Sequence, residues 1–269
     1  MSSSHYTHGT DQAEQQRLSV MNRLINDACL SQTELLEGER VIDFGAGLGQ
    51  FARAMARTTG VPTVGIERSE EQIRGALRQA EVDHESHLLD MRQGDVEMPP
   101  LLEGEQFDVA HARFLLEHVR DPLKIVEAMV GAVRPGGRII LADDDYDLLR
   151  LWPEPAGFSL VWRAYQRTYD RHGNDPIVGR RLVQLLHQAG AQPHRNTWIF
   201  FGSCAGQENF EAYVANLTKI IEEAGDDIAA MGVSRAAVRE SLDALASWGH
   251  RPDAAFWHGI AWAEGVKRS

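Results

Sequence analysis

Cysteine is scarce in this sequence. The two cysteines, Cys29 and Cys204, lie far apart and form no C-x-x-C pair. This usage argues against a disulfide framework and favours a reduced, cytoplasmic chain. No apolar run approaches the length of a membrane span, and the segment Met1 to His5 lacks the apolar core of a signal peptide. We therefore expect a soluble, cytoplasmic protein without a membrane span.

Basic residues are also fewer than acidic ones: the chain has 27 Lys and Arg against 39 Asp and Glu, which gives a net charge of −12. Such a chain repels a phosphate backbone, and the basic pairs Arg180-Arg181 and Lys267-Arg268 are too short to offset this. The sequence thus predicts no nucleic-acid partner. It contains neither H-E-x-x-H nor a paired-cysteine zinc pattern, so we expect no metal site. The oligomeric state stays open, with a homodimer among the alternatives.

What the chain does contain is a glycine-rich turn after a predicted buried strand. The strand, Arg40 to Phe44, leads into Gly45-Ala46-Gly47-Leu48-Gly49, and a helix is expected to begin at about Gln50. Alternate glycines let the backbone bend sharply and lie against a ligand where any Cβ would collide. The amides of the turn and of the new helix leave hydrogen-bond donors at the carboxyl end of the sheet. We expect a small, partly anionic ligand there.

The glycine spacing separates two cofactor classes that use such a turn. The dinucleotide fingerprint G-x-G-x-x-G/A fails when counted from Gly45 and matches only when counted from Gly47 to Ala52. The pattern Asp43-x-Gly45-x-Gly47-x-Gly49 fits without a shift. It resembles motif I of the class I S-adenosylmethionine-dependent methyltransferases. A nicotinamide-dependent oxidoreductase, which needs the later register, is the less favoured alternative.

Further stretches resemble the same family in the same order. Glu67 ends a second predicted strand, at the place where an acidic residue meets a ribose in doubly wound folds. The neighbouring Arg68 could cover the adenine or lie in solvent. Asp95 and Val96 follow a third strand. The resemblance implies that the Asp95 carboxylate accepts the adenine amino group and that the Val96 amide contacts a ring nitrogen.

The stretch Phe107 to Arg113, followed by Leu116-Glu117-His118, resembles the fourth-strand motif of the family. The resemblance implies that the backbone at His111 lies at the methionine end of the cofactor. It spans Arg40 to Ala142, continues more weakly to Gly190, and points to the small-molecule and quinone-type branch. The NPPY or DPPY tetrad of the amino-methylating branches is absent, as is the acidic metal ligand of catechol-type enzymes.

Strands alternate with helices over this region, which predicts a parallel sheet covered on both faces. The resemblance implies an α/β, doubly wound, seven-stranded, mostly parallel sheet of the Rossmann-like methyltransferase kind with helical lid insertions. We expect the following division: an N-terminal lid helix 1–36, a cofactor-binding core 37–145, a lid insertion 146–178, a core continuation 179–204, a helical lid insertion 205–250 and a last core strand 251–269.

The expected activity is methyl transfer from S-adenosylmethionine to a small-molecule acceptor at an O, N, S or C atom. The sulfonium makes the methyl group electrophilic, so positioning supplies most of the acceleration and we name no catalytic residue. Tyr6 is a candidate cofactor contact, and Arg113, Tyr146 and Trp152 are candidate acceptor contacts. The cluster Asp143-Asp144-Asp145 could bind a cation, abstract a proton or be a solvated strand end. An alternative is a protein that binds S-adenosylmethionine for a regulatory or non-methylating role.

Overall fold

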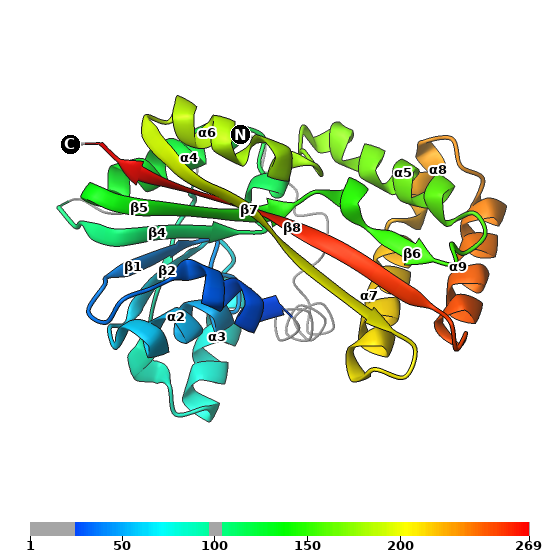
Figure 1. The fold of residues 1–269 in the computed structure, drawn as a ribbon, viewed down its shortest axis with the longest axis horizontal. Helices are drawn as coiled ribbons and strands as arrows, with labels where there is room; N and C mark the ends of the chain where they lie inside the picture. Colours follow the sequence, from blue (N-terminus) through cyan, green and yellow to red (C-terminus); the bar gives the residue numbers. More distant parts are fainter. Residues whose placement is uncertain (1–24, 97–103, 269) are drawn as a thin grey trace.

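A computed structural model describes residues 25–96 and 104–268 (Figure 1). One sheet runs through the described part of the molecule, in the order β3-β2-β1-β4-β5-β8, with β7 on the far side of β8. The first five strands in this order are parallel, and β8 is antiparallel to its neighbours. The strands are β1 (Val41–Phe44), β2 (Thr63–Glu67), β3 (Leu89–Gln93), β4 (Phe107–Arg113), β5 (Val133–Asp144), β6 (Arg150–Trp152), β7 (Ala191–Cys204) and β8 (Ala255–Lys267).

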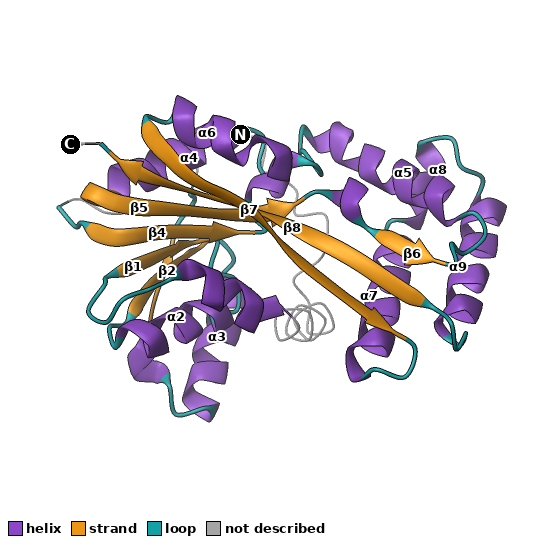
Figure 2. Ribbon diagram, viewed as in Figure 1, coloured by secondary structure: helices purple, strands orange, loops and turns teal. Residues whose placement is uncertain are grey.

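Helices cover both faces of this sheet, as Figure 2 shows. The apolar side chains of α4 and α6 pack on one face, and those of α2 and of the helical residues 25–33 pack on the other. This is the doubly wound, mostly parallel α/β architecture that was expected. The helices are α2 (Gln50–Thr59), α3 (Glu70–Val82), α4 (Pro122–Ala132), α5 (Phe158–Thr168), α6 (Leu182–Gln188), α7 (Glu208–Glu223), α8 (Gly225–Ala230) and α9 (Arg235–Gly249).

The helix ends follow local sequence signals. The Ser69 hydroxyl accepts a hydrogen bond from the Gln72 backbone N–H at 3.2 Å, which is the predicted cap of α3. The Asp121 carboxylate caps α4 in the same way, and Pro122 occupies the first helical position, where it costs no hydrogen bond. The α2 helix ends at Gly60, whose φ of 71° is a left-handed conformation that glycine adopts without strain.

The described sheet has eight strands, one more than expected. The additional strand, β6, has three residues and pairs with residues 255–257 of β8, along the same edge that β5 uses. The last two strands of the core are long: β7 has 14 residues and β8 has 13. Together they form an antiparallel ribbon that extends past the end of β5 (Figure 1).

The far end of this ribbon carries the two predicted insertions. Helix α5 comes from the first insertion, and α7, α8 and α9 come from the second. Their apolar side chains share one hydrophobic cluster with β6 and the start of β8, at whose centre the rings of Tyr213 and Phe256 stack 3.7 Å apart. The two segments therefore build one helical lobe beside the sheet. No helix among the described residues is both long and apolar enough to cross a membrane.

Candidate functional site

The glycine turn joins β1 to α2 with three residues in the left-handed region. The φ angles are 72° at Gly45, 55° at Gly47 and 64° at Gly49. A Cβ at Gly45 would lie 2.9 Å from Leu115, and one at Gly49 would lie 2.7 Å from Leu89. At Gly47 the nearest atom would be the terminal Oε1 of the Gln72 side chain, at 3.0 Å. Gly45 and Gly49 are thus also needed for packing, while Gly47 is needed chiefly for the turn and the space beside it.

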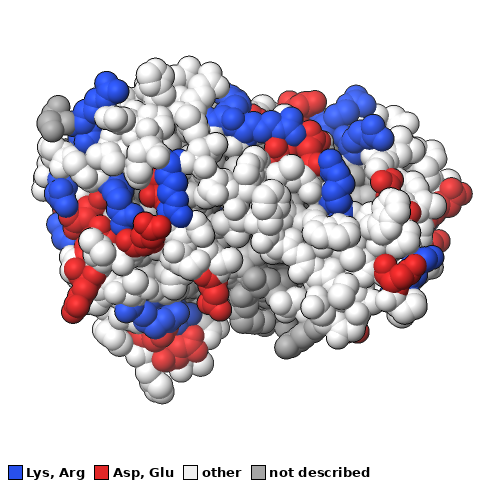
Figure 3. Space-filling model, viewed as in Figure 1, with Lys and Arg blue, Asp and Glu red and all other residues white. Residues whose placement is uncertain are grey.

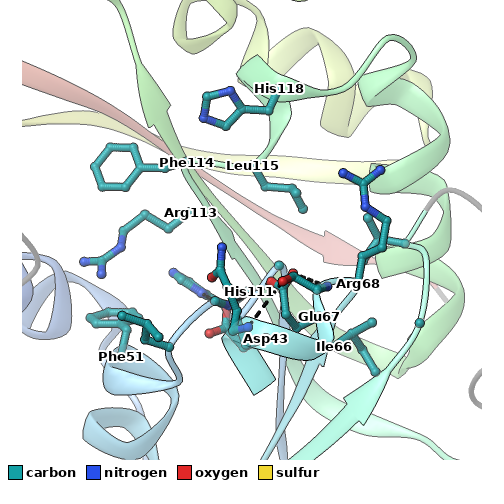
Figure 4. A pocket seen from close by; sticks show the side chains of 18 of the residues that line it. Asp43, Phe51, Ile66, Glu67, Arg68, His111, Arg113, Phe114, Leu115 and His118 are labelled. Atoms are coloured by element: carbon teal, nitrogen blue, oxygen red, sulfur yellow. Dashed lines mark hydrogen bonds and ion pairs between the residues drawn. The ribbon is translucent and has the colours of Figure 1, made fainter. Parts of the chain in front are cut away.

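A pocket opens beside this turn, at the carboxyl ends of β1, β2 and β4 (Figure 4). Ligands of open α/β sheets bind in this position, outside the carboxyl ends of the strands. Most of the candidate residues are brought together here, whereas Gly49 does not line the pocket and lies against Leu89 and Ala76. The candidates that line the pocket are Asp43, Gly45, Ala46, Gly47, Glu67, Arg68, Asp95, Val96, His111 and Arg113.

Glu67 is held in a fixed orientation at the end of β2. One carboxylate oxygen accepts from the Gly47 N–H at 3.0 Å, and the other accepts from the Ser69 N–H at 2.8 Å (Figure 4). A carboxylate has about four lone-pair sites, so two backbone bonds leave capacity for a vicinal diol. One contact ties the acidic side chain to the glycine turn and the other ties it to the start of α3, so the carboxylate is fixed beside the pocket.

Asp43 and His111 form a buried pair on the floor of the pocket. They are cross-strand neighbours of β1 and β4, and Asp43 Oδ1 lies 2.7 Å from His111 Nδ1. The side chain of His111 is fully buried, with its ring 4.9 Å from that of Phe51 and 6.5 Å from that of Trp262. Asp43 and His111 were predicted as separate cofactor contacts, and their pairing was not predicted. The pairing follows from the register of β1 and β4, which residue types alone do not give.

Arg113 brings a positive charge to the same pocket. Its guanidinium lies 4.1 Å from the centre of the Phe51 ring, within the range of a cation–π interaction. One nitrogen donates to the Asn26 side-chain oxygen at 2.8 Å. Because Asn26 belongs to the helical residues 25–33, this bond ties that helix to the pocket wall. The cation is therefore positioned both by packing on the Phe51 ring and by the hydrogen bond to Asn26.

The pocket also contains residues that sequence reasoning did not propose as ligand contacts. Phe51 begins α2, and Phe114 and Leu115 follow β4, where the chain turns away from the sheet. His118, for which a structural role was expected, lines the pocket as well, and its Nε2 lies 3.4 Å from Glu117 Oε1. Alternating patterns predict burial of such side chains but carry no information about which of them face a cavity.

Two of the candidate acceptor contacts lie away from this pocket. The Tyr146 hydroxyl is buried 3.0 Å from the Tyr169 hydroxyl, within the core of the helical lobe. Trp152 is 66% exposed in β6, and neither residue lines the pocket. Both belong to the aromatic-rich insertion, and aromatic content alone does not distinguish a lobe core from a ligand wall. Tyr6 lies outside the described residues.

The acidic cluster at the end of β5 is buried, so it is not a solvated strand end. Asp143 accepts from the backbone N–H groups of Leu115 and Leu116 at 3.2 and 2.8 Å, and Asp145 pairs with Arg180 at 2.6 Å. Burial raises the pKa of Asp143 to about 7 and raises the pKa of Asp144 well above its usual value. Asp143 thereby holds the segment that supplies the Leu115 wall. Among the described residues, no group of three or more His, Cys, Asp or Glu could hold a metal ion.

A buried strand, a left-handed glycine turn and an acidic residue at the end of the next strand are the features of a nucleotide-cofactor site of the doubly wound class. A family model described as a methyltransferase domain matches residues 13–195. The chain therefore belongs to this methyltransferase family, whose cofactor is S-adenosylmethionine, and the expected fold and cofactor are confirmed.

Curated and structural comparisons agree with this assignment. The ubiquinone biosynthesis O-methyltransferase of Psychrobacter arcticus is 36% identical over 141 residues, which cover 52% of this chain and 52% of that protein. The structure resembles the [4+2]-cyclase SpnF, with a TM-score of 0.57, 20% identity and coverage of 91% of this chain and 80% of that one. It also resembles a complex of geranyl diphosphate C-methyltransferase from Streptomyces coelicolor with S-adenosylhomocysteine, with a TM-score of 0.53, 11% identity and coverage of 95% and 81%.

These comparisons differ in what they establish. The chain spans about half the length of the curated relatives that it matches. The likeness to the solved structures, at these identities, establishes the fold and leaves the reaction to be inferred from the site.

Proposed function

We propose that this chain transfers a methyl group from S-adenosylmethionine, held in the pocket beside the glycine turn, to a small-molecule acceptor. The observation that carries the proposal is the joint placement of Glu67, the Gly47 amide and the Asp43–His111 pair around one pocket. A dinucleotide enzyme would need the later glycine register. The family match supports the earlier register, which begins at Asp43.

Each end of the cofactor has residues that fit it. Glu67 would hold the ribose hydroxyls, and Asp95, Val96 and Arg68 would hold the adenine, since they line the adjoining part of the pocket. The methionine end would lie over the turn at Gly45 and Ala46 and beside the backbone of His111, as in the resembling family.

When bound, the cofactor supplies an electrophilic methyl group, so the protein must hold the acceptor in line and exclude water. Arg113 and Phe114 lie on the side of the pocket toward β4 and β5, where they could contact an acceptor. We infer that the helical residues 25–33 and the helical lobe act as the cover of the pocket, because Asn26 already bonds to Arg113.

The O-methyltransferase relative makes an acceptor hydroxyl the first class of acceptor to examine. Both cysteines are free, which supports a reduced, cytoplasmic setting.

Transfer itself can be tested with labelled S-adenosylmethionine and a panel of phenols, hydroxyquinones, amines and thiols. We expect formation of S-adenosylhomocysteine that depends on the acceptor, together with a methylated product of matching mass. Binding of nicotinamide cofactors in place of S-adenosylhomocysteine would contradict the proposal. Binding of the nucleoside without turnover of any acceptor would favour a non-methylating role.

Replacing Glu67 with glutamine is expected to weaken the binding of S-adenosylhomocysteine by about 1.5–3 kcal/mol, the range for a charged hydrogen-bond partner. Glutamine keeps the size of the side chain but loses one acceptor oxygen and the charge. Calorimetry gives the affinity, and Glu70→Ala, at the exposed start of α3, is the control that should bind as wild type does. An analogue that lacks both ribose hydroxyls should lose little further affinity in the variant. An equal loss in variant and wild type would exclude Glu67 as the ribose ligand.

A further inference from the structure

The two ends of the sheet differ in how their free edges are protected. An edge strand exposes unpaired N–H and C=O groups, and proteins guard such edges with charges, prolines, bulges or short strands. At one end, β3 has five residues, and Arg92 pairs there with Asp90 at 2.8 Å and with Glu105 at 2.9 Å. This edge is short and charged, so it is guarded against pairing with another strand.

At the other end, only the first part of β7 is guarded. Pro193 lies there, the pairing register shifts between Pro193 and Arg195, and Arg195 is charged. The second part, residues 196–206, contains no proline and no charged residue. Trp198 to Phe201 are aromatic or β-branched, which favours a strand. Within the described residues, the backbone of 196–203 is hydrogen-bonded only to β8.

Large apolar side chains lie on one face of this unguarded part. Phe200 is 69% exposed, and its ring lies over Gly259, where a Cβ would come within 2.9 Å of it. Trp257 is 51% exposed and lies over Gly202 in the same manner. An aromatic ring that covers a cross-strand glycine stabilises a sheet, which accounts for these positions but not for their exposure. Figure 3 shows a mainly uncharged surface over this end of β7 and β8.

We propose that this edge is the interface with a second copy of the chain, in which β7 of each protomer pairs antiparallel about a two-fold axis near Phe200. An interface of this symmetry must be self-complementary, and an uncharged strand paired antiparallel with itself meets that condition. Each copy has a net charge of −12, so close approach is least opposed where charge is absent, as it is over residues 196–206. Phe200 then lies at the centre of the interface, where aromatic anchors contribute most.

The mass of the full chain in solution tests this directly. Sedimentation velocity over a range of concentrations should give a species of twice the 30.0 kDa chain. Phe200→Lys removes the aromatic anchor, places two like charges opposite each other at the axis and is expected to weaken dimerisation roughly 30-fold or more. Asn196→Lys, at an exposed polar position of the same edge, should do the same without disturbing the packing over Gly259. Leu160→Lys, which replaces a 55% exposed side chain of α5, is the matched control and should dimerise as wild type does.

Disulfide trapping tests the pairing itself. In a Cys204→Ser background, single cysteines at positions 198, 200 and 202 lie on one face of β7, and the one nearest the axis should link two chains on mild oxidation. A cysteine that replaces Leu160 should not link two chains. A monomer at all concentrations would overturn the proposal, as would a dimer that both lysine variants of β7 leave intact. A dimer lost in those variants but linked at none of the three positions would overturn the antiparallel pairing.

Discussion

Replacing Gly47 with valine is expected to lower the affinity for S-adenosylhomocysteine by roughly 100-fold or more, because a branched side chain would occupy the space of the ligand. The chain should remain folded, since among the described residues the new Cβ approaches only the terminal Oε1 of the Gln72 side chain, at 3.0 Å. The left-handed φ of 55° adds strain of roughly 1–2 kcal/mol to the folded state. Calorimetric titration of the purified variant, together with its melting temperature, measures both effects.

Gly60 supplies a matched control for that strain. Gly60 lies at the C-terminal end of α2, the helix that follows the glycine turn, and has a φ of 71°. A Cβ at Gly60 would meet no described atom within 4 Å. Gly60→Val should therefore lose a similar amount of stability while binding the ligand as wild type does. If both variants lose affinity equally, the effect comes from the strain of the backbone. If Gly47→Val binds normally while folded, the glycine turn is not the cofactor site.

The parts of the fold that depend on neighbouring residues in sequence were predictable. The cap at Ser69, the start of α4 at Asp121 and the end of α2 at Gly60 each follow from a side chain or φ preference that acts within one helical turn. The helical lobe was less predictable. Helix α5 has aromatic residues at helical spacing on its buried side, but this spacing does not show whether that side faces the core of a lobe or a ligand. The length of β7 depends on pairing with β8, some fifty residues later, which no local pattern encodes.

In the candidate site, too, the residues that could be predicted are those that depend on local spacing. Residues of the glycine turn and the strand ends, such as Gly47 and Glu67, follow from spacing and from the geometry of a parallel sheet. Tyr146 and Trp152 were proposed from composition alone, and the structure places both outside the pocket. The pairing of Asp43 with His111 depends on the register between β1 and β4, which are separated in sequence by helices α2 and α3 and strands β2 and β3. The register between strands that are far apart in the sequence is what could not be predicted from residue types.

That pair has a measurable consequence for stability. Asp43 is 4% exposed and His111 is fully buried, so removal of either partner leaves a polar group without compensation in the core. An uncompensated buried group costs about 1–3 kcal/mol, and more if it is charged. Both side chains are almost completely buried, so water replaces the lost bond only poorly. The contribution of this contact should therefore exceed that of an equally short contact at the surface.

A double-mutant cycle of Asp43→Ala and His111→Leu is expected to give a coupling free energy of about 1.5–3 kcal/mol in urea unfolding. The matched control is the Asp108–Arg134 pair on the adjoining strands, with a distance of 2.6 Å but side chains 21% and 52% exposed. Its cycle, Asp108→Ala with Arg134→Ala, should give less than about 1 kcal/mol, because water screens the pair and replaces its hydrogen bond. Equal coupling in the two cycles would show that burial does not strengthen the Asp43–His111 contact. In that case the packing of Phe51 and Trp262 around the histidine ring would be what fixes His111 at the floor of the pocket.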